Sequence, residues 1–430
     1  MNFAALIAAV IFLISLAVIF TETLQRTIVG LVGAVLMVAV GKLMRFYSES
    51  QALAAIDFNS LGLLLGMMIL VALLEPTGFF QYLAVWAGRM SKGKPVRLLI
   101  LLGTVTTFVS MFLDNVTTIV LIAPVTVLIS EILGITPAPL LMAEAILSDT
   151  GGVATLVGDP PNMLIGSAAG LSFLDFIFYA LPVVLVAWFI ALFLLRFLFR
   201  RELAIRPKKV KAIMELNPSQ ALNDRRTAMR VLIVLSIAIL FFFVEHMLDI
   251  SPAFIALSAA SVALVWVKPD IKRTLEQIEW SVLLFFAALF VMVGGLQASG
   301  ALTSVIRLIE NADNLPPVLF GVLMIWIVAG LSAVVDNVPI TIAMIPVILG
   351  LKADGIVVTP LWWALVFGAG FGGNGTIIGS TANLVVATIS EKTHTPITSK
   401  LWNKRGLPVM LATCAAASVL YVLIYPLYLR

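Results

Sequence analysis

The sequence has few of the residues on which soluble enzymes depend. Among 430 residues there is one cysteine, Cys414, and there are two histidines, His246 and His394. A single thiol excludes a disulfide framework, and so few Cys and His exclude a zinc site. No P-loop pattern G-x-x-x-x-G-K-[ST] and no Ser/His/Asp arrangement occurs, so any ATPase would be a separate subunit. We therefore expect a protein that is not an enzyme and that has no cofactor and no metal.

Charged residues are also scarce. They make up 12% of the chain, compared with roughly 25% in a soluble domain, and 61% of the residues are hydrophobic. Apolar runs of about 20 residues, long enough to cross a hydrocarbon core about 30 Å thick, recur along the sequence. The sequence predicts an all-α polytopic protein of the lipid bilayer, in the cell inner membrane, with about ten spans. These spans are expected near 3–20, 28–45, 59–75, 140–168, 174–196, 229–245, 252–267, 280–298, 360–388 and 407–428.

The basic residues lie in loops and predict the orientation of the chain. With ten spans, all but five of the 27 Lys and Arg residues fall on one side, including Arg26. That side is cytoplasmic by the positive-inside rule, so we expect both termini to face outward. We expect no nucleic acid as a partner. The five on the opposite side are Lys42, Arg45, Arg307, Lys352 and Arg430.

The two halves of the chain resemble each other. FLDNVTTIVLIAP (112–124) aligns with VVDNVPITIAMIP (334–346) at an offset of 222, and GGVATLVGDPPN (151–162) aligns with GGNGTIIGSTAN (372–383) at 221. Two blocks at nearly one offset predict two copies of one unit, 1–200 and 228–430, joined by a basic cytoplasmic linker, 201–227. Each unit has five spans. An odd number inverts the second copy, as in the inverted repeats of secondary transporters.

Each repeat contains two features that interrupt regular spans. Apolar arms flank the polar tips Asp114-Asn115 and Asp336-Asn337, which predicts two re-entrant hairpins. Glycines break the spans near 140–168 and 360–388. Irregular backbone at membrane depth is tolerated where it is buried in protein or lines a wet cavity, and broken helices direct free N–H and C=O groups at a substrate. We therefore expect both tips and both breaks to meet at one binding site.

The segments LDNVTT, SDTGGVATLVGDPPN, VDNVPITIAMIP and GGNGTIIGSTAN resemble the ion transporter superfamily. Within it they are similar to the branch of ArsB-type arsenite pumps, NhaD-type sodium/proton antiporters and the pink-eyed dilution (P) protein. The GDPPN and GGNGT forms look most like the P-protein-like members. This resemblance implies a scaffold plus a moving transport domain, commonly as a homodimer, and an elevator-type motion.

The candidate site residues are the polar and glycine positions of the tips and breaks. An ionisable group in a span is costly and functional by default, although Asp can also simply cap a helix, and the amides can simply brace their loops. The substrate-binding or ion-binding candidates are Asp114, Asn115, Thr117, Thr118, Gly151, Gly152, Thr155, Asn162, Asp336, Asn337, Thr341, Gly372, Gly373, Asn374, Thr376, Ser380 and Asn383.

Three further carboxyl groups are candidates for proton coupling. Asp149 and Asp159 are acidic in the first repeat only, because the second has Gly370 and Ser380 in their places. A carboxylate that one repeat lacks suits a proton or cation site better than a structural brace, and Asp149 is the leading candidate. Glu144 lies one turn earlier and is either a relay or a buried, protonated residue.

The substrate is predicted from the charge of the site. Four aspartates gather there, with no Lys or Arg expected nearby, so a di- or tricarboxylate would be costly to bring in. We expect proton-coupled efflux of a small inorganic solute, with arsenite or antimonite leading because arsenite is an uncharged trihydroxide near neutral pH. The alternatives are a sodium/proton antiporter of NhaD type and a passive channel of P-protein type.

Overall fold

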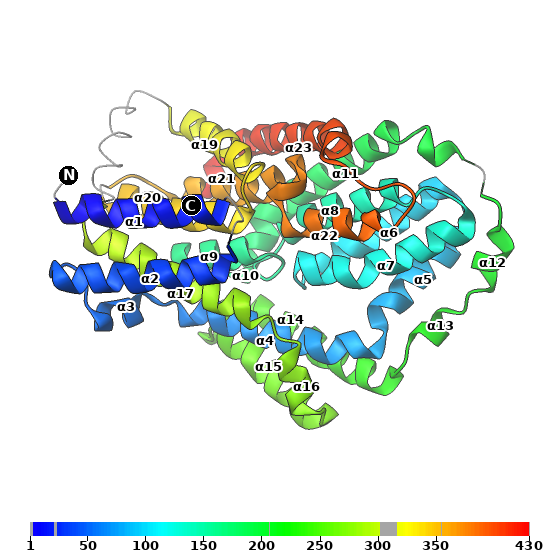
Figure 1. Cartoon of the computed structure of the whole chain (residues 1–430), viewed down its shortest axis with the longest axis horizontal. Helices are drawn as coiled ribbons and strands as arrows, with labels where there is room; N and C mark the ends of the chain where they lie inside the picture. The colour runs from blue at the N-terminus through cyan, green and yellow to red at the C-terminus, as the bar shows by residue number, and fades with distance from the viewer. Residues whose placement is uncertain (1–2, 21–23, 206, 302–315, 354, 430) are drawn as a thin grey trace.

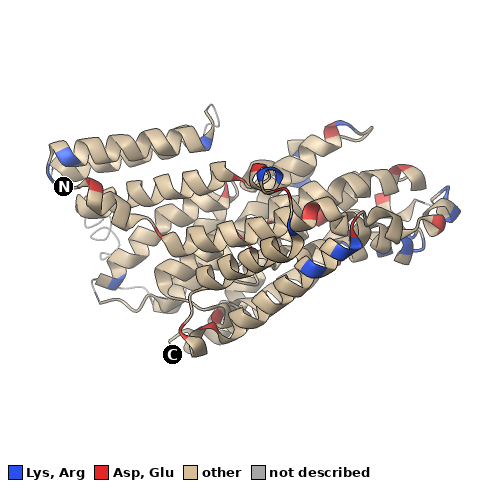
Figure 2. Ribbon diagram, turned by 90° about the horizontal axis from the view of Figure 1, so that it is seen from below, with Lys and Arg blue, Asp and Glu red and all other residues tan. Residues whose placement is uncertain are grey.

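The computed structural model describes residues 3–20, 24–205, 207–301, 316–353 and 355–429, and over these ranges the chain forms helices and no strand. Arg307 and Arg430, two of the five charges expected outside, fall beyond the described residues. Seven described helices are long and apolar enough to cross a membrane, and five apolar helices are shorter. Charged residues, coloured blue and red, are sparse along the ribbons in Figure 2. The expectation of a polytopic, all-α membrane protein is confirmed.

In the first half, the described residues form the helices α1 to α11 with two short helical turns, followed by a linker (Figure 1). These are α1 (Phe3–Phe20), α2 (Arg26–Leu43), α3 (Glu49–Ala55), α4 (Phe58–Leu74), η1 (Glu75–Thr77), α5 (Phe79–Met90), α6 (Pro95–Ser110), α7 (Asn115–Leu133), α8 (Ala138–Gly152), α9 (Pro160–Ala169), α10 (Phe173–Asp175), the π-helical turn η2 (Phe176–Ala180) and α11 (Leu181–Leu198). The linker contains η3 (Glu202–Ala204), α12 (Val210–Glu215) and α13 (Pro218–Ala221).

The second half repeats this order. Its elements are α14 (Arg225–Leu248), α15 (Pro252–Val267), α16 (Ile271–Glu276), α17 (Trp280–Ala298), α19 (Pro317–Ser332), α20 (Asn337–Ala353), α21 (Thr359–Gly372), η4 (Gly373–Gly375), η5 (Ile377–Gly379), α22 (Thr381–Glu391) and α23 (Ser399–Tyr428). Helix α23 begins earlier than the expected span, so Lys400, Lys404 and Arg405 lie on a helix and not in a loop. Thr398 caps this earlier start, and Arg405 is held by Glu202 at 3.1 Å.

Both hairpins and both broken helices are present. Helices α6 and α7 turn at Asp114, and α19 and α20 turn at Asp336. The breaks follow Gly152 and Gly372. Small residues are needed because the hairpins pack tightly on the broken helices: a Cβ on Gly151 would lie 2.7 Å from the carbonyl oxygen of Thr107, and one on Gly372 would lie 2.6 Å from that of Ala329.

One helix group, which we call the frame, consists of α1–α4 and α14–α17. The directions of its helices show that the repeats are inverted. Helix α2 packs along α17, and α4 packs along α15, as the glycine contacts Gly30–Phe285 and Gly66–Ala256 show. Thr27 donates to the carbonyl oxygen of Ser281 at 3.0 Å. These are the second residues of α2 and α17, and Gly30 contacts Phe285 further along, so the two helices are parallel. In the repeat, α15 is the counterpart of α2, and α4 is the counterpart of α17. Helix α4 begins near the C-terminal ends of α2 and α17, beyond α3, so α4 and α15 run in the direction opposite to α2 and α17.

Candidate functional site

The two hairpin tips hold equivalent aspartates in different surroundings. Asp114 caps α7, accepting hydrogen bonds from the backbone N–H of Thr117 at 3.0 Å and from its hydroxyl at 3.2 Å. Asp336 instead accepts from the Thr381 hydroxyl at 2.9 Å and from the Arg26 guanidinium at 2.8 Å. Asp114 is bonded within its own tip, whereas Asp336 is bonded to the start of α22 and to Arg26 of α2.

The position of Arg26 corrects the sequence analysis, which assigned it to a cytoplasmic loop and expected no basic residue near the carboxylates. Helix α2 begins at Arg26, and its packing along α17 through Gly30 brings this first turn beside the second tip. The guanidinium also lies over the ring of Phe285, 5.7 Å from its centre. The ion pair with Asp336 is only partly exposed to solvent, with 36% of the Arg26 and 22% of the Asp336 side chain accessible.

A small cavity of about 50 Å³, which we call the central cavity, lies where the tips meet the frame. Four carboxyl groups and one guanidinium line it, so its wall carries more acidic than basic groups. Burial raises the pKa of Glu279, the charge of Asp114 raises it further, and Arg26 acts in the opposite direction. The lining residues are Arg26, Asp114, Asn115, Val116, Asp159, Pro160, Glu279, Val282, Phe285, Phe286, Asp336, Asn337, Val338, Ser380 and Thr381.

Hydrogen bonds between the repeats hold this site together. The amide of Asn337, at the second tip, donates to Asp159 of the first break at 2.9 Å. Ser380, in the second break, donates to Asp149 at 3.0 Å. The amide of Asn374 donates to the Thr150 hydroxyl at 3.3 Å. Each bond joins residues more than 170 positions apart, so the two breaks and the second tip form one unit.

Asp149 lies directly behind the central cavity and is 1% exposed. Its Oδ1 accepts from Ser380 of one repeat and from Asn115 of the other, the latter at 3.1 Å. Its Oδ2 is buried and has no hydrogen-bond partner among the described residues. An unpaired buried charge is costly, so this environment favours a carboxyl group that carries a proton.

Glu144 is buried one to two turns before Asp149 on α8, where Thr126 donates to its Oε1. Its Oε2 has no partner within the described parts of the chain. Unlike Asp159, Glu144 does not line the central cavity. Glu144 is therefore a buried side chain of α8 that lies away from the tips.

Two of the predicted amides, Asn162 in the first repeat and Asn383 in the second, brace their own loops through equivalent hydrogen bonds. Asn162 donates to the carbonyl oxygens of Gly152 and Thr155 at 2.9 and 2.8 Å, and Asn383 donates to those of Gly373 and Thr376 at 2.9 and 3.0 Å. The hydroxyls of Thr155 and Thr376 in turn donate to the hairpins, at the carbonyl oxygens of Met111 and Ala333. These side chains close the broken loops and fix them to the tips.

The structure brings only part of the predicted set to the cavity wall. Asp114, Asn115, Asp159, Asp336, Asn337 and Ser380 line it. Thr117 lines an adjoining side cavity of about 140 Å³, which extends from Glu75 and Gln277 to Asp114. Thr341 donates to its own helix at the carbonyl oxygen of Asn337 at 2.9 Å, and the Thr118 hydroxyl is buried without a partner among the described residues.

Sequence reasoning missed three polar lining residues: Arg26, Glu279 and Thr381. Each stands at or just before the first residue of a helix, α2, α17 or α22. Charged and hydroxyl residues at such positions are usually explained as loop or capping residues. The available signal for Arg26 was that it stands alone before an apolar run, whereas most other basic residues are clustered.

The comparisons with known proteins agree with this architecture. Residues 15–368 match the family model described as "Citrate transporter" (CitMHS). The chain is 37% identical to the "46 kDa membrane protein" of Mycobacterium leprae (strain TN), over 96% of this chain and 97% of that protein. It is 32% identical to the "P protein" of Homo sapiens, over 93% of this chain and 57% of that protein.

The fold is also similar to a solved structure. The YdaH transporter of Alcanivorax borkumensis, whose topology is described as unusual, aligns with a TM-score of 0.60 and 18% identity, over 86% of each chain. The resemblance to the ion transporter superfamily and to P-protein-like members is thus confirmed. The chain belongs to the citrate transporter (CitMHS) family and is an integral, multi-pass membrane transporter.

Proposed function

We propose that the protein is a proton-coupled secondary transporter that exports a small hydroxylated inorganic solute, with arsenite as the leading substrate. The observation that carries this proposal is Asp149, a buried carboxyl group with one oxygen held by both repeats and the other unpaired. Such a group can exchange a proton when the surrounding tips and breaks move, which is what coupling requires. Asp159, which lines the central cavity, is in this proposal the first acceptor of a hydrogen bond from the solute.

The substrate class follows from the charge and size of the cavity. Arg26 is ion-paired with Asp336, so among the described residues Asp114, Asp159 and Glu279 have no ion pair of their own. A multiply charged anion would be repelled there. An uncharged trihydroxide such as arsenite can instead donate hydrogen bonds to these carboxylates and accept them from Asn115 and Asn337.

Sodium/proton antiport is the second candidate, because carboxylate and amide oxygens are ligands for hard cations. Passive conduction, as in the channel alternative, is disfavoured by the unpaired buried acid. Citrate is a necessary comparison, since the family model carries that description and Arg26 supplies a guanidinium that could bind a carboxylate.

The discriminating experiment is transport by the purified protein in sealed vesicles under an imposed pH gradient. Labelled arsenite, sodium and citrate are offered separately. We expect arsenite to accumulate against its gradient when protons flow the other way, and to show counterflow. Accumulation of sodium alone selects the antiporter, uptake of citrate overturns the charge argument, and flux without counterflow selects a channel.

We further propose that transport uses an elevator-type motion of the unit formed by tips and breaks against the frame. The side cavity supports this, because it is lined by Gln277, which follows the basic segment that contains Lys272 and Arg273. By the positive-inside rule this segment is cytoplasmic. The structure then corresponds to the inward-facing state.

A further inference from the structure

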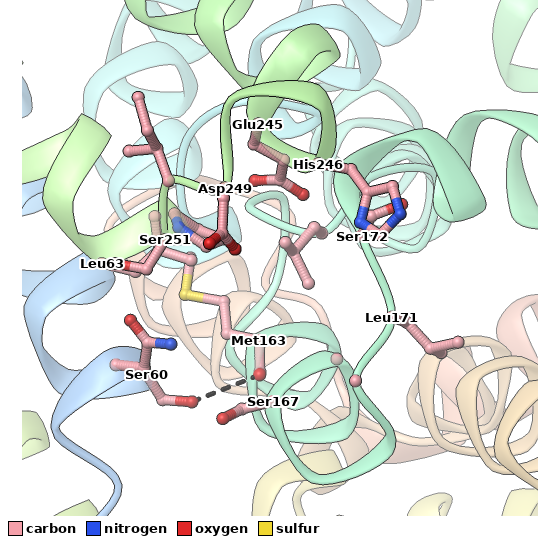
Figure 3. Close-up of a pocket in the computed structure, with 16 residues that line it drawn as sticks. Ser60, Leu63, Met163, Ser167, Leu171, Ser172, Glu245, His246, Asp249 and Ser251 are labelled. Atoms are coloured by element: carbon pink, nitrogen blue, oxygen red, sulfur yellow. Dashed lines mark hydrogen bonds between the residues drawn. The ribbon is translucent and has the colours of Figure 1, made fainter.

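A larger cavity of about 370 Å³, which we call the outer cavity, lies at the opposite end of the frame (Figure 3). One wall is formed by the starts of α4 and α15, with Ser60, Leu63 and Ser251, and the other by the end of α9. Glu245, on α14, projects its carboxyl group toward it and is 5% exposed. Its Oε1 accepts from the backbone N–H of Phe173 at 2.7 Å, and its Oε2 has no partner in the described part of the chain.

The wall of the outer cavity formed by α4 and α15 is the symmetry counterpart of the wall formed by α17 and α2, against which the tips lie in this structure. Gly66 of α4 contacts Ala256 of α15 in the same way that Ala288 of α17 contacts Gly30 of α2. This aligns the first turn of α15 with that of α2, so that Pro252 and Ser251 correspond to Arg26 and Gln25. The match between α2 and α15 has an offset of 226, whereas the repeat offset of 222 holds between α4 and α17 and matches Asp57 with Glu279.

The frame therefore offers two related docks for the tips. The first dock is the N-terminal ends of α2 and α17, where both tips lie in this structure. The second dock is the N-terminal ends of α4 and α15, which now face the end of α9 across the outer cavity. An inverted repeat can reach a second state by exchanging the contacts of its halves. In that state Asp114 faces Ser251 and Pro252, and Asp336 faces Asp57.

We propose that Arg26 is a built-in substitute for the coupling cation, present at the first dock and missing at the second. This inference rests on the proposed function. Arg26 belongs to α2 and stays with the frame when the tips leave. At the second dock Pro252 stands in its place. In the described chain no Lys or Arg lines the outer cavity, whose basic side chain is the imidazole of His246, and Glu245 and Asp249 add acidic groups.

The consequence is a directional exchange. At the second dock the acidic cluster has no arginine, so a proton or a sodium ion must enter with the tips to offset their charge. On return, the Arg26 guanidinium again pairs with Asp336 and expels that cation. Because the first dock lies at the cytoplasmic side by the charge rule, the cation enters from outside and leaves inside, which is the direction that can drive export.

Cysteine cross-linking tests this without any transported solute. Gln25 and Val335 line one cavity at the first dock, so Gln25→Cys with Val335→Cys reports that state. Their counterparts, Ser251→Cys with Leu113→Cys, report the second. Both pairs are made in a Cys414→Ala background, which removes the buried native thiol.

In the otherwise unchanged protein we expect the second-dock cross-link to increase with sodium or with proton concentration, and separate titrations identify the ion. Arg26→Leu should raise this cross-link at low cation concentration, by roughly 5- to 150-fold as is usual for coupled two-state equilibria. It should also remove the cation dependence, because both docks then need a cation. Arg26→Lys should retain the dependence.

Two results would overturn the inference: no second-dock cross-link under any condition, or equal cation dependence with and without the positive charge at residue 26. A failure of the proposed function is distinguishable from both. In that case the cross-links respond to cation and to Arg26→Leu as expected, but the vesicles accumulate none of the tested solutes.

Discussion

Asp149 and Asp159 are neighbouring acids with different tasks in the proposed cycle. Asp149 has one unpaired oxygen and no access to the central cavity, whereas Asp159 lines that cavity and accepts from Asn337. Burial disfavours a charge unless a partner compensates it. The group with an unpaired oxygen is therefore the better proton carrier, and the group with the amide partner is the better solute contact.

We predict that Asp149→Asn abolishes transport driven by a pH gradient while leaving binding or downhill exchange measurable, because the amide mimics a permanently protonated acid. Uptake into vesicles with and without the gradient checks this. Asp159→Asn is the comparison, expected to weaken apparent affinity and to keep coupling. If the two phenotypes are reversed, the roles are reversed, and if both variants remain coupled and tight, the proton route passes through another group such as Glu144.

The tip amides should contribute to binding through their carboxylate partners. Asn115 bonds to Asp149, and Asn337 bonds to Asp159. Replacing either by Ala removes a hydrogen bond to a buried charged or titratable group, worth about 1.5–3 kcal/mol, and we expect apparent affinity to fall roughly tenfold or more. Substrate titration of vesicle uptake measures it, with membrane expression as the control for folding. If the apparent affinity is unchanged in both variants, the amides only brace their loops and do not contribute to binding.

At the scale of elements, the packing of the hairpins on the broken helices depends on glycine. We expect Gly372→Ala to lower stability by about 1–3 kcal/mol, the usual cost of overpacking, because the new methyl group would meet the backbone of Ala329 at 2.6 Å. Thermal unfolding in detergent measures the loss.

Gly330→Ala is the matched control, on the hairpin helix α19 against which Gly372 packs. Gly330 is exposed in α19, and a methyl group added there would meet no atom within 4 Å. The substitution should therefore be neutral or raise stability by up to about 1 kcal/mol through helix propensity. Equal melting temperatures for both variants would contradict the packing argument.

Much of this architecture could be predicted from the sequence, because the repeat carries it. The tips, the breaks and many helix boundaries follow from Asp-Asn pairs, glycine pairs and apolar run lengths, which are local signals, although the early start of α23 did not. The bonds between repeats, such as Ser380 to Asp149, could not be predicted, since nothing local indicates which polar groups meet after folding. The placement of Arg26 depended in the same way on the tertiary packing of α2 along α17.

For the whole molecule, the orientation in the membrane is a separate prediction. We expect Val210→Cys, at the start of α12 in the linker, to be labelled by an impermeant thiol reagent only from the cytoplasmic side. The reason is the concentration of Lys and Arg between Arg196 and Arg230, which the positive-inside rule places in the cytoplasm. Labelling of intact cells from outside would reverse the assigned topology and the direction of cation flow.

The bonds between the repeats have a consequence for how the polypeptide can be divided. Ser380 to Asp149, Asn337 to Asp159 and Asn374 to Thr150 join the two halves inside the protein, so the linker is not the main connection between them. Two separately translated halves, divided within residues 201–227, should therefore find each other in the membrane and co-purify as a transporter, each supplying what the other half lacks.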